Sequence, residues 1–217
     1  MNANRFGIFS WYGFRSPLAE RLRSIRAAGF HSTMLWWGDE LAFNEHGPEE
    51  VVELARENGL VIENIHVPFG QANDLWSRDR DIRESIVDRH NAWIRQASDH
   101  GIPIVVMHAS RGTNVAAPNA YGLLAVESLV REAEKSNVVL ALENTSATYL
   151  LEYVLEEIDS PNLRVCYDTS HAQLSGGHGF HLMRKLRDRI SCFHISDNDG
   201  LEDRHWSIGE GVIDWDG

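Results

Sequence analysis

The chain has 217 residues, 43% of them hydrophobic, and its formal net charge of −12 disfavours a nucleic-acid partner, because nucleic-acid binders usually carry a basic excess. No apolar run approaches the roughly 20 residues of a membrane-spanning helix, and the first residues lack the basic flank and long apolar stretch of a signal peptide. We therefore expect a cytoplasmic globular protein of one large or two small domains, without a membrane partner.

Short apolar runs alternate with helical patterns along the whole chain. The runs predict strands, and apolar residues repeated every three or four positions predict amphipathic helices between them. The predicted strands are "RFGIFSW", "STMLWW", "LVIENIHVP", "IPIVVMHAS", "VVLALENT", "LRVCYD" and "ISCFHISD". The predicted helices lie at about 18–29, 48–59, 81–100, 119–136, 148–158 and 180–188. Gly29 and Gly59 are typical helix stops, and Pro48 is a typical first helical residue.

Seven strands separated by helices predict a parallel sheet with right-handed crossovers. Continuous apolar runs are typical of strands that are buried on both faces. An open doubly wound sheet and a (β/α)8 TIM barrel are the two α/β architectures that fit. No glycine-rich nucleotide fingerprint follows the first strand, and the number of units favours the barrel. We find no linker, so we expect a single barrel domain over residues 1–217.

Residue types that bind metals stand at the ends of five successive predicted strands. They are His66, His108, Glu143, Asp168 and His194. Each has a structural explanation, such as a helix N-cap at Asp168. Functional residues of a (β/α)8 barrel gather at the C-terminal ends of its strands, however, so the shared position predicts one cluster. A mixed set of imidazoles and carboxylates suits zinc, manganese or iron.

Residues two positions before these strand ends share their face of the sheet. They are Asn64, Val106, Ala141, Cys166 and Cys192, all small or medium in size. Such residues are expected one layer down inside a narrow barrel. We therefore interpret the two cysteines as reduced, buried thiols beneath the site and not as ligands.

Further candidates follow the last two strands. His171 lies three residues after Asp168, in a predicted loop that can reach back over the same rim. Asp203 and His205 stand two residues apart after the seventh strand, and the glycines of Gly209-Glu210-Gly211 allow a tight loop close to a ligand. The remaining histidines are interpreted as structural or surface residues: His31, His46, His90, His100, His178 and His181.

Six motifs resemble those of the xylose isomerase-like TIM-barrel superfamily, and the resemblance runs over nearly the whole chain. The motifs are "IHVPFG", "VMHAS", "ALENT", "YDTSHA", "FHISDN" and "DRHWSIGEGVIDW". The superfamily includes sugar isomerases and epimerases, and also endonuclease IV-type apurinic endonucleases. In the isomerase and epimerase branch, the resemblance implies metal ligands at Glu143, Asp168 and His194. It also implies a substrate-contacting histidine at His171 and a fourth ligand, a glutamate, at the end of an eighth strand.

The endonuclease branch implies a larger ligand set for three zinc ions. That set falls on His66, His108, Glu143, Asp168, His171, His194, Asp203 and His205, so the ligands leave the reaction open. Tryptophans near predicted loops and strand ends suit the apolar face of a sugar, although core packing also explains them: Trp11, Trp36, Trp37 and Trp206. The acidic balance disfavours DNA. We favour a divalent-metal-dependent isomerase or epimerase of a sugar, sugar phosphate or polyol. The alternatives are a zinc phosphodiesterase acting on abasic DNA, a metal-dependent dehydratase or lyase, and an inactive binding protein.

The expected chemistry is proton transfer next to a carbonyl. An ion such as Mn²⁺ or Zn²⁺, or Mg²⁺ or Co²⁺, would bind two adjacent oxygens of the open-chain sugar and stabilise the enediolate. Glu143 would orient the ion or take the proton, with His171 as the second catalytic residue. The substrate-binding candidates are His66, His108, His205 and Trp11, and His171 and His205 are candidates to bind hydroxyls or a phosphate.

Seven predicted strands fall one short of the eight in a closed barrel. The eighth strand, its helix and the last glutamate are missing after "VIDWDG", so we expect a C-terminally incomplete barrel, from a trimmed or truncated form or completed by a partner chain. The edges of the first and seventh strands should then be uncovered, or paired with another chain in an oligomer. Metal binding should be weaker than in a complete site.

Overall fold

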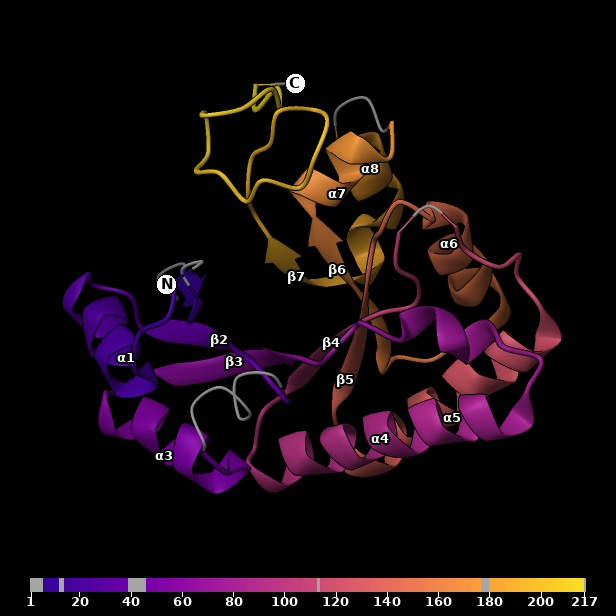
Figure 1. The fold of residues 1–217 in the computed structure, drawn as a ribbon, viewed down its shortest axis with the longest axis horizontal. Coiled ribbons are helices and arrows are strands. Elements are labelled where there is room, and N and C mark those ends of the chain that lie inside the picture. The colour runs from indigo at the N-terminus through magenta and orange to yellow at the C-terminus, as the bar shows by residue number, and fades with distance from the viewer. Residues whose placement is uncertain (1–5, 12–13, 39–45, 113, 177–179, 217) are drawn as a thin grey trace.

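The computed structural model describes residues 6–11, 14–38, 46–112, 114–176 and 180–216 (Figure 1). Its seven parallel strands form one sheet in which the spatial order is the sequence order. A doubly wound sheet would reverse its strand order at a switch point. The sheet curls as in a (β/α)8 barrel, with helices such as α3, α4 and α5 on its outer side (Figure 1), which confirms the predicted fold class.

The predicted strands and helices are all present in the described residues. The strands are β1 (Gly7–Phe9), β2 (Ser32–Trp36), β3 (Val61–His66), β4 (Ile104–His108), β5 (Val139–Glu143), β6 (Leu163–Asp168) and β7 (Ile190–His194). The α-helices are α1 (Leu18–Ala27), α3 (Pro48–Glu57), α4 (Arg80–Asp99), α5 (Ala120–Ser136), α6 (Thr148–Glu157), α7 (Thr169–Leu174) and α8 (His181–Leu186). Two 3₁₀ helices, η1 (Ala72–Trp76) and η2 (Arg187–Arg189), and α7 were not predicted.

Local capping explains where the long helices begin and end. The Asp79 side chain accepts hydrogen bonds from two backbone N–H groups at the start of α4, and Asn119 accepts one from Gly122 at the start of α5. Helix α5 ends at Asn137, which adopts the left-handed conformation with φ of 54°. Helix α3 begins at Pro48 as predicted. These capping residues are visible in the sequence, so the ends of the three helices can be predicted from it.

Alternation along the strands separates two apolar regions. Val105 and Met107 of β4 belong to the large core between sheet and helices. Val106 points the other way and packs with Ala141 and Cys166 in a small cluster inside the curl. His108, two residues after Val106, therefore lies on the inner face at the end of its strand.

The edge strands of the described sheet are β1 and β7. Ile8 of β1 is 37% exposed and Phe193 of β7 is 50% exposed. Among the described residues, β1 and β7 are thus the edge strands that the sequence predicts, and their pairing with another chain stays a prediction. No described helix combines the length and the apolar character that crossing a bilayer requires.

The indole of Trp76 ties η1, α5 and β4 together behind the strand ends. Its Nε1–H donates to the carbonyl of Ala109, directly after His108, at 2.7 Å. Its ring lies against Gly122 of α5, where any Cβ would overlap the ring atoms. This close approach requires a glycine at position 122, and the hydrogen bond from Trp76 to Ala109 fixes the backbone directly after β4.

We predict that Gly122→Ala destabilises the fold, although alanine gains about 1 kcal/mol of helix propensity over glycine. The added methyl group would overpack the Trp76 site, which costs about 1–3 kcal/mol. Urea denaturation should show a net loss of stability. The control Leu124→Ala, at a position on α5 that is 57% exposed, should change stability by less than about 0.5 kcal/mol. A more stable Gly122→Ala protein would contradict this packing.

Candidate metal centre

Three of the strand-end histidines converge on the carboxylate of Glu143. Nε2 of His66 lies 3.2 Å from Oε2 of Glu143, and Nε2 of His108 lies 3.4 Å from the same oxygen. Nδ1 of His194, from the other end of the sheet, lies 3.0 Å from it. Glu143 and the two histidines of β3 and β4 are buried. The structure therefore brings these predicted site residues into one cluster.

Asp168 completes the set of five strand ends. Its Oδ2 lies 3.8 Å from Nδ1 of His194. Its Oδ1 accepts a 2.7 Å hydrogen bond from the backbone N–H of His171 and so caps α7. The N-cap and site explanations of Asp168 are therefore compatible, because each uses a different carboxylate oxygen.

His171 lies in the helix α7 and not in a loop as predicted. The six residues of α7 are too few to show a helical apolar period, and only the cap at Asp168 indicates the helix. Nδ1 of His171 lies 3.0 Å from Oε1 of Glu143, on the carboxylate oxygen that the other three histidines leave free. The expectation that His171 reaches the same rim is confirmed.

Asn144 is a positioning residue that sequence reasoning missed. Its side chain accepts from the backbone N–H of Asp168 at 2.7 Å and donates to the Asp168 carbonyl at 2.9 Å. Its own carbonyl lies 2.9 Å from Nδ1 of His171. Asn144 is fully buried. The sequence signal that could have identified this role is an amide side chain directly after Glu143, because an amide can bridge the open ends of two adjacent strands.

Asp203 and His205 lie outside this cluster and meet it through His171. Oδ2 of Asp203 is 3.3 Å from Nε2 of His171, and its Oδ1 accepts a 2.6 Å hydrogen bond from Ser170. Nε2 of His205 is 3.4 Å from Asp203, and its side chain is 69% exposed. The pair is thus adjacent to the centre, with His205 facing solvent.

Asp197 holds the loop that carries Asp203. Its buried carboxylate accepts from the N–H groups of Gly209 and Ile213 and from the indole of Trp215, at 3.0–3.2 Å. Burial would raise the pKa of Asp197, but these donors lower it to about 2. Gly211 packs so closely on Asp197 that a Cβ has no room. The predicted tight glycine loop is therefore real, but it encloses a carboxylate of this chain.

The hydrogen-bond pattern leaves acceptor atoms facing one another. Nδ1 of His66 is 2.9 Å from the Val67 carbonyl, which can only accept, so in a neutral ring Nε2 carries a lone pair toward Glu143. Nε2 of His194 lies 3.1 Å from the sulfur of Met34, which is only a weak acceptor, so in a neutral ring the proton can stay on Nδ1 and be donated to Glu143. The facing acceptors of His66 and Glu143 require a proton or a metal ion between them.

The close packing of imidazoles and carboxylates shifts the pKa values of the cluster. Burial would raise the pKa of Glu143, but the charges of His194 and His108 and hydrogen bonds from imidazoles hold it well below the ordinary value. Burial would lower the pKa of His194, but Glu143 and Asp168 raise it to about 9. Against the same burial, Asp203 and Glu143 raise the pKa of His171 to about 11. Without an ion, extra protons balance the carboxylates.

Burial dominates the titration of two other members of the cluster. It lowers the pKa of His108 and raises the pKa of Asp168. The Nδ1 atom of His108 is buried and has no hydrogen-bond partner among the described residues. A neutral imidazole with an unengaged nitrogen and an adjacent carboxylate is suited to a metal.

The residues present fit a divalent cation. Three groups each offer three ligand atoms that lie within 4.8 Å of one another, and Glu143 belongs to all three. The groups are His66 with His108 and Glu143, Asp168 with His171 and Glu143, and Cys166 with His194 and Glu143. Imidazole nitrogens with carboxylate oxygens are ligands that zinc and manganese accept. The individual ligand roles stay predictions.

The strand ladder explains why Cys166 adjoins Glu143. Cys166 is in register with Glu143 on one side and with Cys192 on the other. Burial raises the pKa of the Cys166 thiol well above its ordinary value, and a protonated thiol is a poor ligand. This environment supports the prediction that Cys166 is a packing residue, whereas the hydrogen bond with Cys166 lowers the pKa of the Cys192 thiol.

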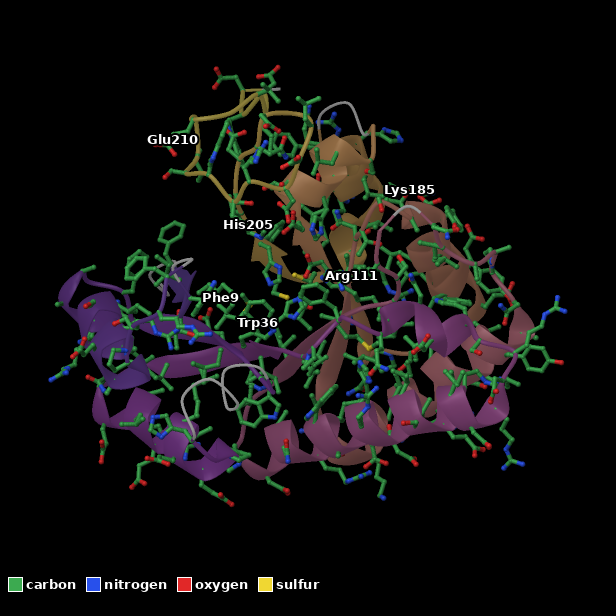
Figure 2. The ribbon with its side chains drawn as sticks, viewed as in Figure 1. Phe9, Trp36, Arg111, Lys185, His205 and Glu210 are labelled. Carbon is green, nitrogen blue, oxygen red and sulfur yellow. The ribbon has the colours of Figure 1, made fainter. Side chains whose placement is uncertain are left out.

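Aromatic rings line one side of the centre. Trp36 stacks on Phe69 at 6.0 Å and lies edge-on to His66 and beside Phe9. Figure 2 shows Phe9, Trp36, Arg111 and His205 around the middle of the view. Phe69, which sequence reasoning missed, stacks on His108 at 4.5 Å.

The other tryptophans differ in position. Trp37 is fully buried, and its Nε1–H donates to Gln96, so it belongs to the core and not to a substrate wall. Trp206 pairs with Asp197 and is 39% exposed. Trp11 lies beside Arg21, whose guanidinium is 5.5 Å from the ring centre. A substrate contact at Trp11 stays a prediction.

Comparison with known proteins gives both sequence and structural relatives. MJ1311, an uncharacterized protein of Methanocaldococcus jannaschii, is 27% identical over 169 residues, which are 70% of this chain and 56% of that protein. The chain thus spans little more than half the length of this relative.

Many solved structures share the fold, and two of them show the extent of the likeness. A D-tagatose 3-epimerase-like protein superposes with a TM-score of 0.80 at 23% identity, covering 96% of this chain and 82% of its own. An L-ribulose 3-epimerase superposes with a TM-score of 0.76 at 23% identity, and the match covers 97% of this chain and 74% of that protein's chain. The family model that describes the xylose isomerase-like TIM barrel matches residues 22–217. The chain therefore belongs to the xylose isomerase-like TIM-barrel family.

Proposed function

We propose that this chain is one barrel domain that isomerises or epimerises a sugar with the help of a divalent metal ion. The observation that carries the proposal is the convergence of Glu143, Asp168 and His194, with His171, at the strand ends. The resemblance to the isomerase and epimerase branch implies metal ligands at the first three positions and a substrate contact at His171. The epimerase names of both solved relatives support the same substrate class.

Glu143, Asp168 and His194 would hold the ion. When bound, a divalent cation supplies electrophilic stabilisation of the negative charge that develops on the oxygens of a sugar carbonyl. Mn²⁺ and Zn²⁺ fit the mixed nitrogen and oxygen donors best.

The side chains around the cation position carry out the proton transfer. Glu143 is held ionised, so one of its oxygens can accept a proton from the carbon next to the carbonyl. Nδ1 of His171 faces Glu143, and its Nε2–H, which faces Asp203 at 3.3 Å, would donate to a substrate hydroxyl that takes the place of that contact. The rings of Trp36 and Phe69 offer an apolar surface to the sugar and limit the access of water.

A zinc phosphodiesterase acting on abasic DNA is the second candidate. His66 and His108 also contact Glu143, and Asp203 lies between His171 and His205, as the endonuclease branch implies. The net charge of −12 opposes the approach of a DNA backbone. The sugar reaction is therefore the favoured proposal.

A parallel assay separates the two functions. The full chain, loaded with Mn²⁺ or Zn²⁺, is incubated with a panel of ketoses and aldoses and with a duplex that contains an abasic site. Appearance of an isomer or epimer without incision supports the proposal. Incision without sugar turnover, with a rate that falls steeply as salt rises, would establish the phosphodiesterase instead.

We predict that Glu143→Gln lowers turnover by a factor of about 10² to 10⁴, because the amide neither accepts the proton nor balances the imidazoles. Isothermal titration should show weaker binding of Mn²⁺ as well. Glu84→Gln removes the same charge from an exposed ion pair on α4 and should change neither. Circular dichroism checks folding, with Glu143→Asp as a charge-retaining second variant. Full activity of Glu143→Gln would rule out this role.

We predict that metal affinity rises with pH up to about pH 9. A ligating imidazole must be unprotonated, and in the ion-free protein His194 keeps its proton up to a pKa of about 9. Below that pH each ion must displace the proton, so affinity falls about tenfold per pH unit and per proton as the pH falls.

Calorimetric titration in buffers of different ionisation enthalpy measures the protons that are released. His31→Gln, at an exposed position outside the cluster, should leave the pH dependence unchanged. An affinity that is flat between about pH 7 and pH 9, with no proton release, would contradict the pKa of His194 and its role as a ligand.

A further inference from the structure

An arginine at the rim of the metal centre is not used by the proposed reaction. Arg111 follows β4 three residues after His108, and its side chain is exposed. The guanidinium carbon lies 5.4 Å from the centre of the Phe69 ring. The Phe69 ring in turn stacks on His108 at 4.5 Å. Arg111 thus adjoins the aromatic wall of the site (Figure 2).

The backbone of Arg111 is held in place by Asn73 of η1. The Asn73 side chain accepts from the Arg111 N–H at 2.8 Å and donates to the Arg111 carbonyl at 2.9 Å. The backbone N–H and the backbone carbonyl of Arg111 are therefore both fixed. The guanidinium lies over the face of the Phe69 ring, which orients it. A side chain ordered before binding loses less entropy when a ligand arrives.

The charge of Arg111 is not neutralised within the described structure. Among the described residues, no carboxylate forms an ion pair with its guanidinium and no side chain or carbonyl accepts a hydrogen bond from it. Other arginines are paired: Arg204 with Asp199, Arg95 with Glu132 and Arg131 with Glu127. The five N–H donors of Arg111 remain available to an anion, and their planar fork matches a phosphate or a carboxylate.

The distance from the metal centre fits one molecule that contacts both. The two ring distances, 5.4 Å and 4.5 Å, place the guanidinium carbon within about 10 Å of the His108 ring centre. An extended carbon chain advances roughly 1.25 Å per bond, so a group four or five bonds from the reacting carbons lies about 6 Å away. A charge-assisted hydrogen bond adds about 2.8 Å.

We infer that the substrate is an acidic open-chain sugar whose terminal phosphate or carboxylate binds to Arg111 while its carbonyl end lies at Glu143. This inference rests on the proposed function, and it narrows the substrate class from sugars in general to anionic ones. Because the chain carries a net charge of −12, long-range attraction does not favour such a ligand, so a local cation at the rim must recognise it.

Three variants of the metal-loaded full chain test the inference. Arg111→Gln removes the charge, Arg111→Lys keeps the charge but loses the fork, and Arg131→Gln removes an arginine charge on α5, away from the strand ends. Binding of inorganic phosphate and of acetate is measured by calorimetry, which requires no turnover. The KM values of a ketose phosphate, a keto sugar acid and the matching neutral ketose are then compared.

We expect Arg111→Gln to weaken phosphate or acetate binding about 10- to 100-fold, the loss of one charge-assisted contact. The KM of the matching acidic sugar should rise at least tenfold more than that of the neutral ketose, with Arg111→Lys intermediate. If Arg111→Gln weakens the binding of phosphate more than that of acetate, the substrate is a sugar phosphate. If it weakens the binding of acetate more, the substrate is a sugar acid.

Equal effects of Arg111→Gln and Arg131→Gln, or a loss of anionic and neutral substrates in equal measure, would overturn the inference. Arg111-dependent phosphate binding without conversion of any sugar would instead reject the proposed function and leave the anion site standing. The two failures are therefore distinguishable.

Discussion

The fold is arranged around one buried carboxylate. Isolated in the interior, an ionised glutamate would cost several kcal/mol in lost hydration. Glu143 escapes that cost because four imidazoles surround its two oxygens at 3.0–3.4 Å. The imidazoles in turn face acceptors and need a positive charge among them. This mutual requirement makes the cluster a place for a cation, as an excess proton or as a metal ion.

Strand register brings the members of the cluster together. His108 is level with Glu143, and Asp168 is level with His194, because these residues are ladder partners on neighbouring strands. Between these pairs the register steps by two residues, since Glu143 pairs with Cys166 and not with Asp168. Such stagger accompanies the closure of a sheet into a barrel. Asn144 bridges the step with two hydrogen bonds to the backbone of Asp168.

The strand ends were predictable because two sequence signals coincide at each of them. A buried strand shows as a continuous apolar run, and a histidine or carboxylate directly after it breaks the run. The short helix α7 shows no such period, so His171 was placed in a loop. The roles of Asn144, Phe69 and Arg111 depend on neighbours distant in the sequence, which the residue types alone do not reveal. Trp37 was ambiguous because core and wall positions alternate along a strand, and the side that it faces depends on the helix α4.

The central claim is that Glu143 is the shared ligand of a divalent cation. Crystals of the full chain grown with Mn²⁺ or Zn²⁺, and measured at the absorption edge of the metal, test it directly. We expect an anomalous peak within about 2.0–2.2 Å of a Glu143 oxygen, with Asp168 and His194 among its other ligands. A fully occupied peak elsewhere, or an ion-free cluster in crystals that hold the metal at another site, would contradict the account.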